Sequence, residues 1–250
     1  MTHIKPFTII YEDDSIIAVN KAPGIAVVGE RWDEDAPRLD RIIKEELASR
    51  GKRKTELYTV HRIDKDTSGL VIFAKDSETH KTLSLAFEKR EVEKMYCAVV
   101  HGRPLWTGGK TSCELPLIPD GNKKHLTIVD KYHGKPSRTG FTLLLSAGNY
   151  SVLEARPETG RTHQIRVHLS ALGYPIVCDP LYGKHVRSGT MEGIYLSSIK
   201  RNWHGDEAEE RPLLARLGLH AARLVYNKIV YEAPLQKDMA SLIKQMEKFR

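Results

Sequence analysis

Short β-prone runs alternate with amphipathic helical stripes along this chain, and this alternation constrains the fold more than any other feature of the sequence. Phe7–Tyr11 and Ile16–Asn20 are rich in β-branched residues, and the turn formers Asp13–Ser15 separate them. This pattern predicts a β-hairpin. Across Pro37–Ser49, apolar residues recur at helical spacing, and Gly51 follows as a residue that can end a helix. Strands and helices therefore share the chain from its start.

The rest of the chain continues this alternation. Strands are expected on both sides of a charged turn within residues 57–74, over Lys94–Gly102, and in a hairpin of Thr139–Leu145 with Tyr150–Arg156. Helices are expected after the N-cap residues Ser77 and Thr162, and along a last apolar stripe of Met239, Leu242, Ile243, Met246 and Phe249. Without repeats or a polar linker, the sequence predicts one compact α+β domain over residues 1–250.

Composition excludes several classes of protein. A chain of 250 residues with 40% hydrophobic residues can bury its own core. Its 3 cysteines are odd in number and lack CxxC spacing, which argues against a disulfide framework or a zinc cluster. No segment approaches the ~20 apolar residues of a membrane-spanning helix. We therefore expect a cytoplasmic protein.

The net charge of +7 makes a polyanionic partner such as nucleic acid plausible, although a basic surface that is only solvated would give the same total. Between His101 and Arg138 the imbalance is local, because basic side chains outnumber acidic ones there. The basic residues are Arg103, Lys110, Lys123, Lys124, Lys131, Lys135 and Arg138, and the acidic ones are Glu114, Asp120 and Asp130.

The stretch "HRIDKDTSGLVIFAKD" (His61–Asp76) concentrates charge in a turn directly before a strand. By residue type alone, Asp64 is most simply a carboxylate that closes the turn, Arg62 a surface charge and His61 a packed imidazole. A catalytic carboxylate is the alternative.

A second charged stretch, "GRTHQIRVHLSALGYP", places two arginines and two histidines on or just before one helix. His163 and His168 are five residues apart, whereas a metal-binding pair on one helical face is four apart, so zinc is disfavoured. Arg161 or Arg166 would suit a carboxylate or phosphate, and an exposed basic helix face is the alternative.

Taken together and in order, these stretches resemble the RluA family of RNA pseudouridine synthases. The resemblance covers most of the chain. It includes "VNKAPG" (Val19–Gly24), "HRIDKDTSGLVIFAK" (His61–Lys75), "KMYCAVVHG" (Lys94–Gly102), "RPETGRTHQIRVHLSALGYPIVCDPLYG" (Arg156–Gly183), and "LGLHAARLVY" followed by "APLQKDM". It implies a mixed, mainly antiparallel central sheet flanked by helices and crossed by a catalytic cleft. It also implies an isomerase that converts uridine in structured RNA, ribosomal or transfer, to pseudouridine.

The resemblance also implies roles for single residues. Asp64 matches the essential catalytic carboxylate, Tyr96 an aromatic residue that packs on the target uracil and can transfer a proton, and Arg166 the basic residue that pairs with the aspartate. Arg62 matches an arginine that enters the RNA stack where the uridine leaves it. Ile63 stands where leucine is usual, a swap of similar volume.

We expect further substrate-binding residues around these: His61, Arg161, His163, Lys123 and Lys124. Isomerisation neither adds nor removes atoms, so no cofactor and no metal is expected. Many relatives carry a small RNA-binding domain before the synthase domain, and this chain begins directly with the hairpin. We therefore expect a single catalytic domain that acts as a monomer on RNA, without an obligate protein partner.

Two other classes of protein are compatible with the sequence. A non-catalytic RNA-binding or ribosome-assembly factor could keep the same fold, although the joint presence of Asp64, Tyr96 and Arg166 argues against it. A metal-dependent hydrolase that uses His61, Asp64, His163 and His168 is disfavoured by the histidine spacing. Neither the target uridine nor the role of Asp64 as nucleophile or base follows from the sequence.

Overall fold

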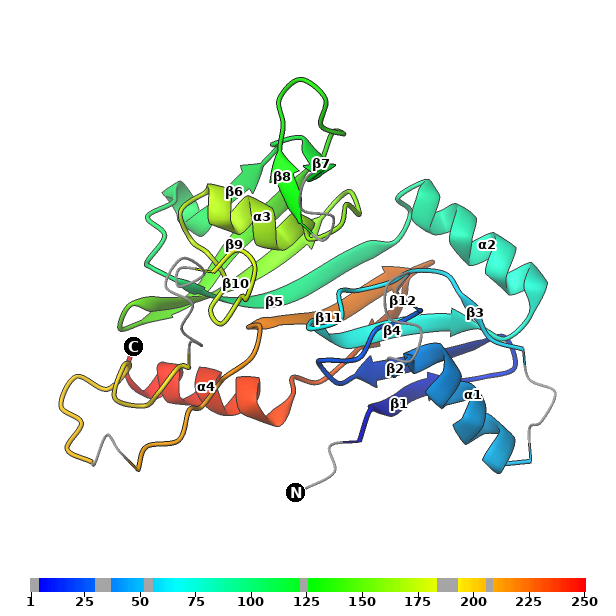
Figure 1. Cartoon of the computed structure of the whole chain (residues 1–250), viewed down its shortest axis with the longest axis horizontal. Coiled ribbons are helices and arrows are strands. Elements are labelled where there is room, and N and C mark those ends of the chain that lie inside the picture. Colours follow the sequence, from blue (N-terminus) through cyan, green and yellow to red (C-terminus); the bar gives the residue numbers. More distant parts are fainter. Residues whose placement is uncertain (1–4, 30–36, 52–55, 122–125, 184–192, 206–208) are drawn as a thin grey trace. The chain divides into compact units, whose positions relative to one another are not determined.

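The chain is divided into two compact units (Figure 1). Unit 1 comprises Met1–Lys94 and His220–Pro234, and unit 2 comprises Met95–Leu219 and Leu235–Arg250. The computed structural model describes residues 5–29, 37–51, 56–121, 126–183, 193–205 and 209–250. Each unit is built on strands with helices packed against them.

Unit 1 contains four neighbouring strands in the order β1-β2-β4-β11. Their bounds are Phe7–Glu12, Ile16–Lys21, Ser68–Ala74 and Leu219–Tyr226. Two shorter strands extend this group, since β3 (Tyr58–Thr59) pairs with β4, and β12 (Ile229–Glu232) pairs with β11. β11 runs parallel to β4, whereas the other pairs are antiparallel.

The amino-terminal hairpin is confirmed, and its turn is closed by a side chain. Oδ1 of Asp13 accepts hydrogen bonds from the backbone N–H groups of Ser15 (2.8 Å) and Ile16 (2.7 Å). Every residue of β2 and of β4 is buried. Gly69 in β4 has φ +114°, and a Cβ there would lie 2.2 Å from the Ala221 carbonyl oxygen, so the close approach of β11 requires glycine.

Helices α1 and α2 belong to unit 1. α1 (Leu39–Ser49) buries Leu39, Ile43 and Leu47, which confirms the predicted helical stripe. α2 (Ser77–Glu88) packs against β3 and β4. The N-cap of α2 is Asp76, whose Oδ1 accepts the Thr79 N–H at 2.7 Å. The prediction of Ser77 as the cap is therefore wrong by one residue: a carboxylate at the preceding position captures the amide, and Ser77 becomes the first helical residue.

Unit 2 contains four antiparallel strands in the order β5-β10-β9-β6. Their bounds are Glu93–His101, Tyr150–Pro157, Thr139–Ala147 and Lys110–Cys113. The predicted hairpin around residues 147–149 is confirmed as β9 and β10. A separate two-stranded ribbon is formed by β7 (Leu117–Pro119) and β8 (Thr127–Val129), and a 3₁₀ turn, η1, spans Thr107–Gly109.

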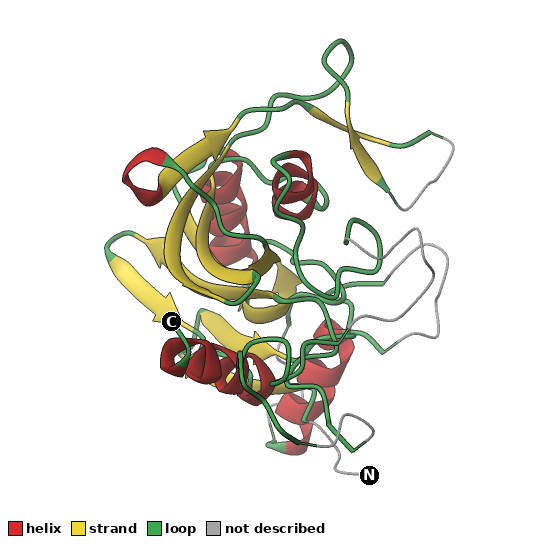
Figure 2. Ribbon diagram, turned by 90° about the vertical axis from the view of Figure 1, so that its left-hand side faces the viewer, coloured by secondary structure: helices red, strands yellow, loops and turns green. Residues whose placement is uncertain are grey.

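Two helices, α3 (Gln164–Ala171) and α4 (Lys237–Lys248), cover opposite faces of these strands (Figures 1 and 2). Successive residues of a strand point to opposite faces. In β5, Ala98 and Val100 accordingly join the buried cluster of α3, whereas Val99 joins the cluster of Met239, Leu242 and Met246 from α4. The last predicted helical stripe is confirmed by this packing.

The start of α3 differs from the prediction. His163, not Thr162, is the N-cap residue, and it has a left-handed φ of 53° without a side-chain cap. Instead, the Gln164 side chain folds back, and its Oε1 accepts the Arg161 N–H at 3.0 Å. Arg166 on α3 is only 2% exposed, so the alternative of an exposed basic helix face is wrong for this residue.

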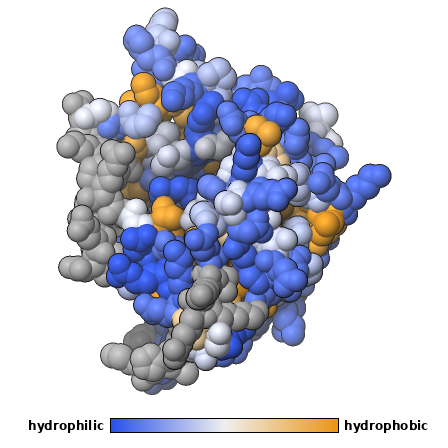
Figure 3. All heavy atoms as spheres, turned by 90° about the vertical axis from the view of Figure 1, so that its right-hand side faces the viewer, coloured by the Kyte–Doolittle hydropathy of each residue, from blue (hydrophilic) through white to orange (hydrophobic). Residues whose placement is uncertain are grey.

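The predicted α+β class with a mixed, mainly antiparallel sheet flanked by helices is confirmed. The single domain over residues 1–250 and the catalytic cleft stay predictions. Among the described residues, no helix is long and apolar enough to span a bilayer. Figure 3 shows one face of the molecule, on which hydrophilic side chains predominate and hydrophobic ones form small separate groups.

Candidate active site

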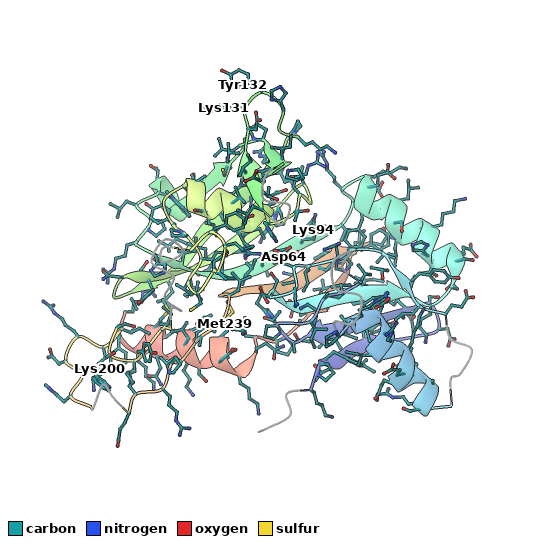
Figure 4. All side chains as sticks on the ribbon, in the orientation of Figure 1. Asp64, Lys94, Lys131, Tyr132, Lys200 and Met239 are labelled. Carbon is teal, nitrogen blue, oxygen red and sulfur yellow. The ribbon has the colours of Figure 1, made fainter. Side chains whose placement is uncertain are left out.

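Asp64 lies on the connection between β3 and β4 of unit 1 (Figure 4). Its backbone carbonyl accepts the Thr67 N–H at 3.1 Å, which closes the turn before β4. Along this connection Ile63 is buried, Asp64 is partly buried and Arg62 is exposed. The apolar neighbour thus anchors the chain while the two charged side chains keep access to solvent.

Lys21, at the end of β2, is fully buried and is hydrogen-bonded to this connection. Its Nζ donates to the carbonyl oxygens of Ala22 and Lys65, each at 2.8 Å. The backbone N–H of Gly24 donates to the same Lys65 carbonyl at 2.9 Å. The stretch "VNKAPG" is therefore tied to the residue next to Asp64.

His61 anchors the beginning of the connection. Its ring stacks on Phe87 of α2, with centroids 4.5 Å apart and planes 18° apart. Its Nε2 accepts the Ile72 N–H at 2.9 Å, so this nitrogen carries no proton. Burial, with a smaller effect of the Lys94 charge, lowers the pKa of His61 from 6.5 to about 3. The imidazole is thus neutral and supports the loop, and its predicted role in binding substrate stays a prediction.

Arg166 of unit 2 forms a buried ion pair with Asp179. Its Nε donates to Asp179 Oδ2 at 2.8 Å, and its Nη2 donates to Oδ1 at 2.7 Å. The side chains are 2% and 0% exposed. A bidentate pair of this kind fixes the plane of the guanidinium as well as its position.

Asp179 and Tyr182 complete the surroundings of Arg166. Oδ1 of Asp179 also accepts the backbone N–H groups of Leu181 (2.9 Å) and Tyr182 (3.0 Å). The Arg166 guanidinium lies over the Tyr182 ring, 5.1 Å from its centroid. The segment after α3 therefore wraps the arginine with a carboxylate on one side and an aromatic face on another.

His163 is connected to the same network. Its Nδ1 lies 2.8 Å from the Tyr182 hydroxyl, which also accepts the Thr127 N–H of β8 at 2.8 Å. Because the hydroxyl accepts from Thr127, it can donate its own proton to Nδ1. Burial is the main cause that raises the pKa of Tyr182, so the neutral phenol is favoured.

The other predicted residues differ in their surroundings. Tyr96 is partly buried on β5, opposite Ala155 of β10, and packs against the buried cluster that contains α3 residues. Arg161 lies partly exposed, with Nη2 3.3 Å from the Pro136 carbonyl oxygen. Lys123 and Lys124 lie outside the described residues.

The predicted residues thus fall into two groups. His61, Arg62 and Asp64 share one connection of unit 1, and unit 2 carries the others, Tyr96, Arg161, His163 and Arg166. The pairing of Arg166 with Asp64 concerns residues of different units and stays a prediction. Among the described residues, no group of three or more His, Cys, Asp or Glu side chains could hold a metal ion.

Sequence reasoning missed three residues that hold this machinery: Lys21, Asp179 and Tyr182. All three lie inside the stretches on which the resemblance rests. The position of Lys21 was a usable signal, because it ends an apolar run that predicts a buried strand. A buried lysine needs hydrogen-bond acceptors, which indicates a structural role. For Asp179 and Tyr182 the residue types alone gave no such signal.

Comparison with known proteins identifies the family. The family model described as RNA pseudouridylate synthase matches residues 15–171. The chain is 31% identical to the ribosomal large subunit pseudouridine synthase D of Zymomonas mobilis, over 96% of this chain and 73% of that protein. It is 37% identical to the dual-specificity RNA pseudouridine synthase RluA of Vibrio vulnificus, over 72% of this chain and 70% of that protein.

The fold is also found among solved structures. Human RNA pseudouridylate synthase domain containing 4 superposes with a TM-score of 0.74 at 21% identity, over 96% of this chain and 92% of that one. Human RNA pseudouridylate synthase domain containing 1 gives a TM-score of 0.63 at 22% identity, over 96% and 94% of the two chains. The chain therefore belongs to the RNA pseudouridylate synthases, is of the RluA type, and is an isomerase that forms pseudouridine in RNA.

Proposed function

We propose that this enzyme modifies the RNA of the large ribosomal subunit, with Asp64 as its essential carboxylate. The proposed target rests on the similarity, over 96% of the chain, to an enzyme named for the large ribosomal subunit. The non-catalytic alternative gains no support from the comparisons. The cytoplasmic location, the monomeric state and the absence of an obligate protein partner stay predictions.

The chemistry explains why a held carboxylate is needed. Pseudouridine forms when the bond between ribose and the ring nitrogen breaks, the uracil turns, and the ring rejoins through carbon. Asp64 acts either as the nucleophile or as the base that removes a ribose proton. The hydrogen bonds from Lys21 and Gly24 to the adjacent Lys65 carbonyl support this assignment, because they restrict the connection on which the carboxylate lies.

The uridine must leave the RNA stack before it can react, at a cost of roughly a few kcal/mol. Arg62 is suited to fill the vacated position, because its side chain is exposed and its planar group can stack on bases. Tyr96 supplies an aromatic face for the everted uracil and a hydroxyl for proton transfer. Arg161 and His163 contact the RNA in the same proposal.

Arg166 is assigned to the Asp64 carboxylate, whose charged form a guanidinium would stabilise. The support is the preorganisation of Arg166 within unit 2. Its orientation is set by Asp179 and by the Tyr182 ring, so little reorganisation would be needed when substrate binds.

A second target class, transfer RNA, is favoured by one observation. The chain is 37% identical to an enzyme named as dual-specificity, over 72% of the chain. One enzyme could serve both RNAs if the two targets present similar loops, since a loop lowers the cost of extruding the base.

Mapping of pseudouridine in total RNA tests the proposal. Cells without the gene should lack at least one pseudouridine in large-subunit ribosomal RNA, and the wild-type gene should restore it. A gene carrying Asp64→Asn should not restore it, although the variant protein folds and binds RNA. An unchanged large-subunit map would refute the ribosomal target, and restoration by Asp64→Asn would refute the role of Asp64.

A further inference from the structure

Tyr132 is a large aromatic side chain with almost no packing. It is 93% exposed, and among the other exposed large hydrophobic residues of the described ranges only Leu105 reaches the same fraction. Lys131 and Tyr132 lie at the tip of the loop that follows β8 in unit 2 (Figure 4). An aromatic ring at such a tip contributes nothing to the core, so packing does not explain why an aromatic residue stands there.

The loop is closed by its first residue. Oδ1 of Asp130 accepts the backbone N–H groups of Tyr132 (2.8 Å) and His133 (2.9 Å). The Asp130 carbonyl accepts the Gly134 N–H at 3.0 Å. The backbone N–H groups of His133 and, next, of Tyr132 lower the pKa of the Asp130 side chain, because they stabilise its charged carboxylate. Its negative charge is thus directed at the loop's own backbone.

The end of the loop is equally fixed. Leu117 and Lys135 exchange two backbone hydrogen bonds, of 3.0 and 2.8 Å. A Cβ at Gly134 would lie 2.3 Å from the Asp130 carbonyl oxygen and 2.7 Å from the Pro116 carbonyl carbon. The loop can therefore be this tight only with glycine there. These contacts restrict the backbone that carries Tyr132, so binding would cost little further backbone entropy.

Charges around the ring indicate the kind of partner. Lys131 and Lys135 are both exposed, one directly before Tyr132 and one shortly after it. An exposed aromatic ring with an exposed lysine on each side of it in the sequence suits single-stranded RNA, because a base can stack on the ring while lysines of the same loop bind neighbouring phosphates. Duplex RNA suits it less, because its bases are already stacked on one another.

We propose that the Asp130–Lys135 loop is an RNA contact in which Tyr132 stacks on an unpaired base of the substrate and Lys131 and Lys135 bind adjacent phosphates. The inference rests on the proposed function, since it concerns how the same RNA is held. It concerns affinity, however, and leaves the chemistry at Asp64 unchanged.

Binding of a single-stranded oligouridylate and of an RNA duplex of equal length tests the stacking. Tyr132→Ala should weaken single-strand binding about 5- to 150-fold, the range expected for loss of one stacked base. Tyr132→Phe keeps the aromatic face and should bind like wild type. Leu105→Ala removes an equally exposed hydrophobic side chain of the same unit and serves as the matched control, with unchanged binding.

The salt dependence of binding separates the lysines from the ring. Replacing both Lys131 and Lys135 by Gln should reduce the slope of log affinity against log salt by about 1.4, since each phosphate contact with a single strand contributes about 0.7. Tyr132→Ala should leave this slope unchanged, because stacking releases no counterions.

Three results would overturn the inference: wild-type affinity of Tyr132→Ala for the single strand, equal weakening of duplex binding, or failure of the wild-type enzyme to bind the single strand. None of these results bears on whether the gene is needed for pseudouridine in large-subunit ribosomal RNA. Conversely, if deleting the gene left that map unchanged while Tyr132→Ala still weakened single-strand binding, only the ribosomal target would be refuted. The two proposals can therefore fail separately.

Discussion

Replacing Asp179 by Asn tests whether the buried ion pair holds Arg166 in place. Oδ1 of Asp179 accepts three hydrogen bonds, from Arg166 Nη2 and from the N–H groups of Leu181 and Tyr182. Asn can keep these three with its carbonyl oxygen. It loses the fourth, because its NH₂ group would face the Nε–H of Arg166, which donates to Oδ2 in the wild type. The charge is also lost.

The free-energy cost follows from these contacts. Removing one partner of a buried ion pair destabilises a protein by about 3–5 kcal/mol, because the other charge is left uncompensated. We expect Asp179→Asn near the lower end of this range. Asp179→Ala also deprives two backbone N–H groups of their acceptor, at about 1–3 kcal/mol for each that stays unsatisfied. Since domains are stable by only about 5–15 kcal/mol, the Ala variant is expected to be close to unfolded.

Urea unfolding of Asp179→Asn, of Arg166→Met and of the double variant measures this directly. The double variant carries no buried charge at either position, so it should be more stable than Asp179→Asn alone. Rates of pseudouridine formation are then compared under conditions where all variants are folded. Turnover by Asp179→Asn should fall more than its KM changes, because Asp179 positions Arg166 without touching RNA. Additive stabilities, or wild-type turnover of Asp179→Asn, would refute the reasoning.

Three further predictions concern unit 1. The pKa of His61 is 6.5 unfolded and about 3 folded, so the unfolded state binds the extra proton and stability is lost as pH falls from 6.5 towards 3. His61→Gln, which can still accept the Ile72 N–H, should remove a slope approaching 1.4 kcal/mol per pH unit in that window, measured by urea unfolding at several pH values. Lys21→Met should lower turnover while RNA affinity is retained, because Lys21 donates to the carbonyl next to Asp64. Lys75→Met is the control, since Lys75 donates to β1 and its turn instead, and it should lower turnover less. Equal losses would contradict a role for Lys21 in holding Asp64. Arg62→Ala should reduce turnover more than RNA affinity if the side chain replaces the everted base, and a pure affinity loss would argue against it.

The strands and helices could be predicted because their signals are local. The hairpin of β1 and β2 is encoded by two β-branched runs and by a turn whose Asp13 accepts the amides that follow it. Met239, Leu242 and Met246 repeat at helical spacing, and the same residues are buried in α4. In such segments each residue's neighbours along the chain already determine its conformation.

The helix starts were harder to predict, because several residues compete to cap the same amides. Asp76 and Ser77 are both good N-caps, and the carboxylate one residue earlier captures the Thr79 N–H. At α3, Thr162 had the right residue type, but the Gln164 side chain folds back on the Arg161 N–H instead. Propensity ranks such candidates and does not decide between them.

The contacts of the candidate site could not be predicted, because they join residues distant in sequence and often end on the backbone. Any residue offers a carbonyl, so nothing in the sequence shows that Lys21 donates to the carbonyl of Lys65. The pairing of Arg166 with Asp179 likewise depends on how the segment after α3 turns back. The family resemblance identified the stretches of sequence that contain these residues, but it does not explain why the stretches are so long.

Their length has a physical reason. A reacting side chain acts only if it is held within a fraction of an ångström, and the groups that hold it must themselves be fixed. In unit 1, Lys21 fixes a carbonyl next to Asp64, and in unit 2, Asp179 fixes the plane of Arg166. Each unit thus orients its own proposed catalytic residue by buried, charge-assisted hydrogen bonds. Because such bonds lose their effect when either end is removed, the supporting residues should tolerate substitution almost as poorly as the reacting ones, although none of them needs to touch the RNA.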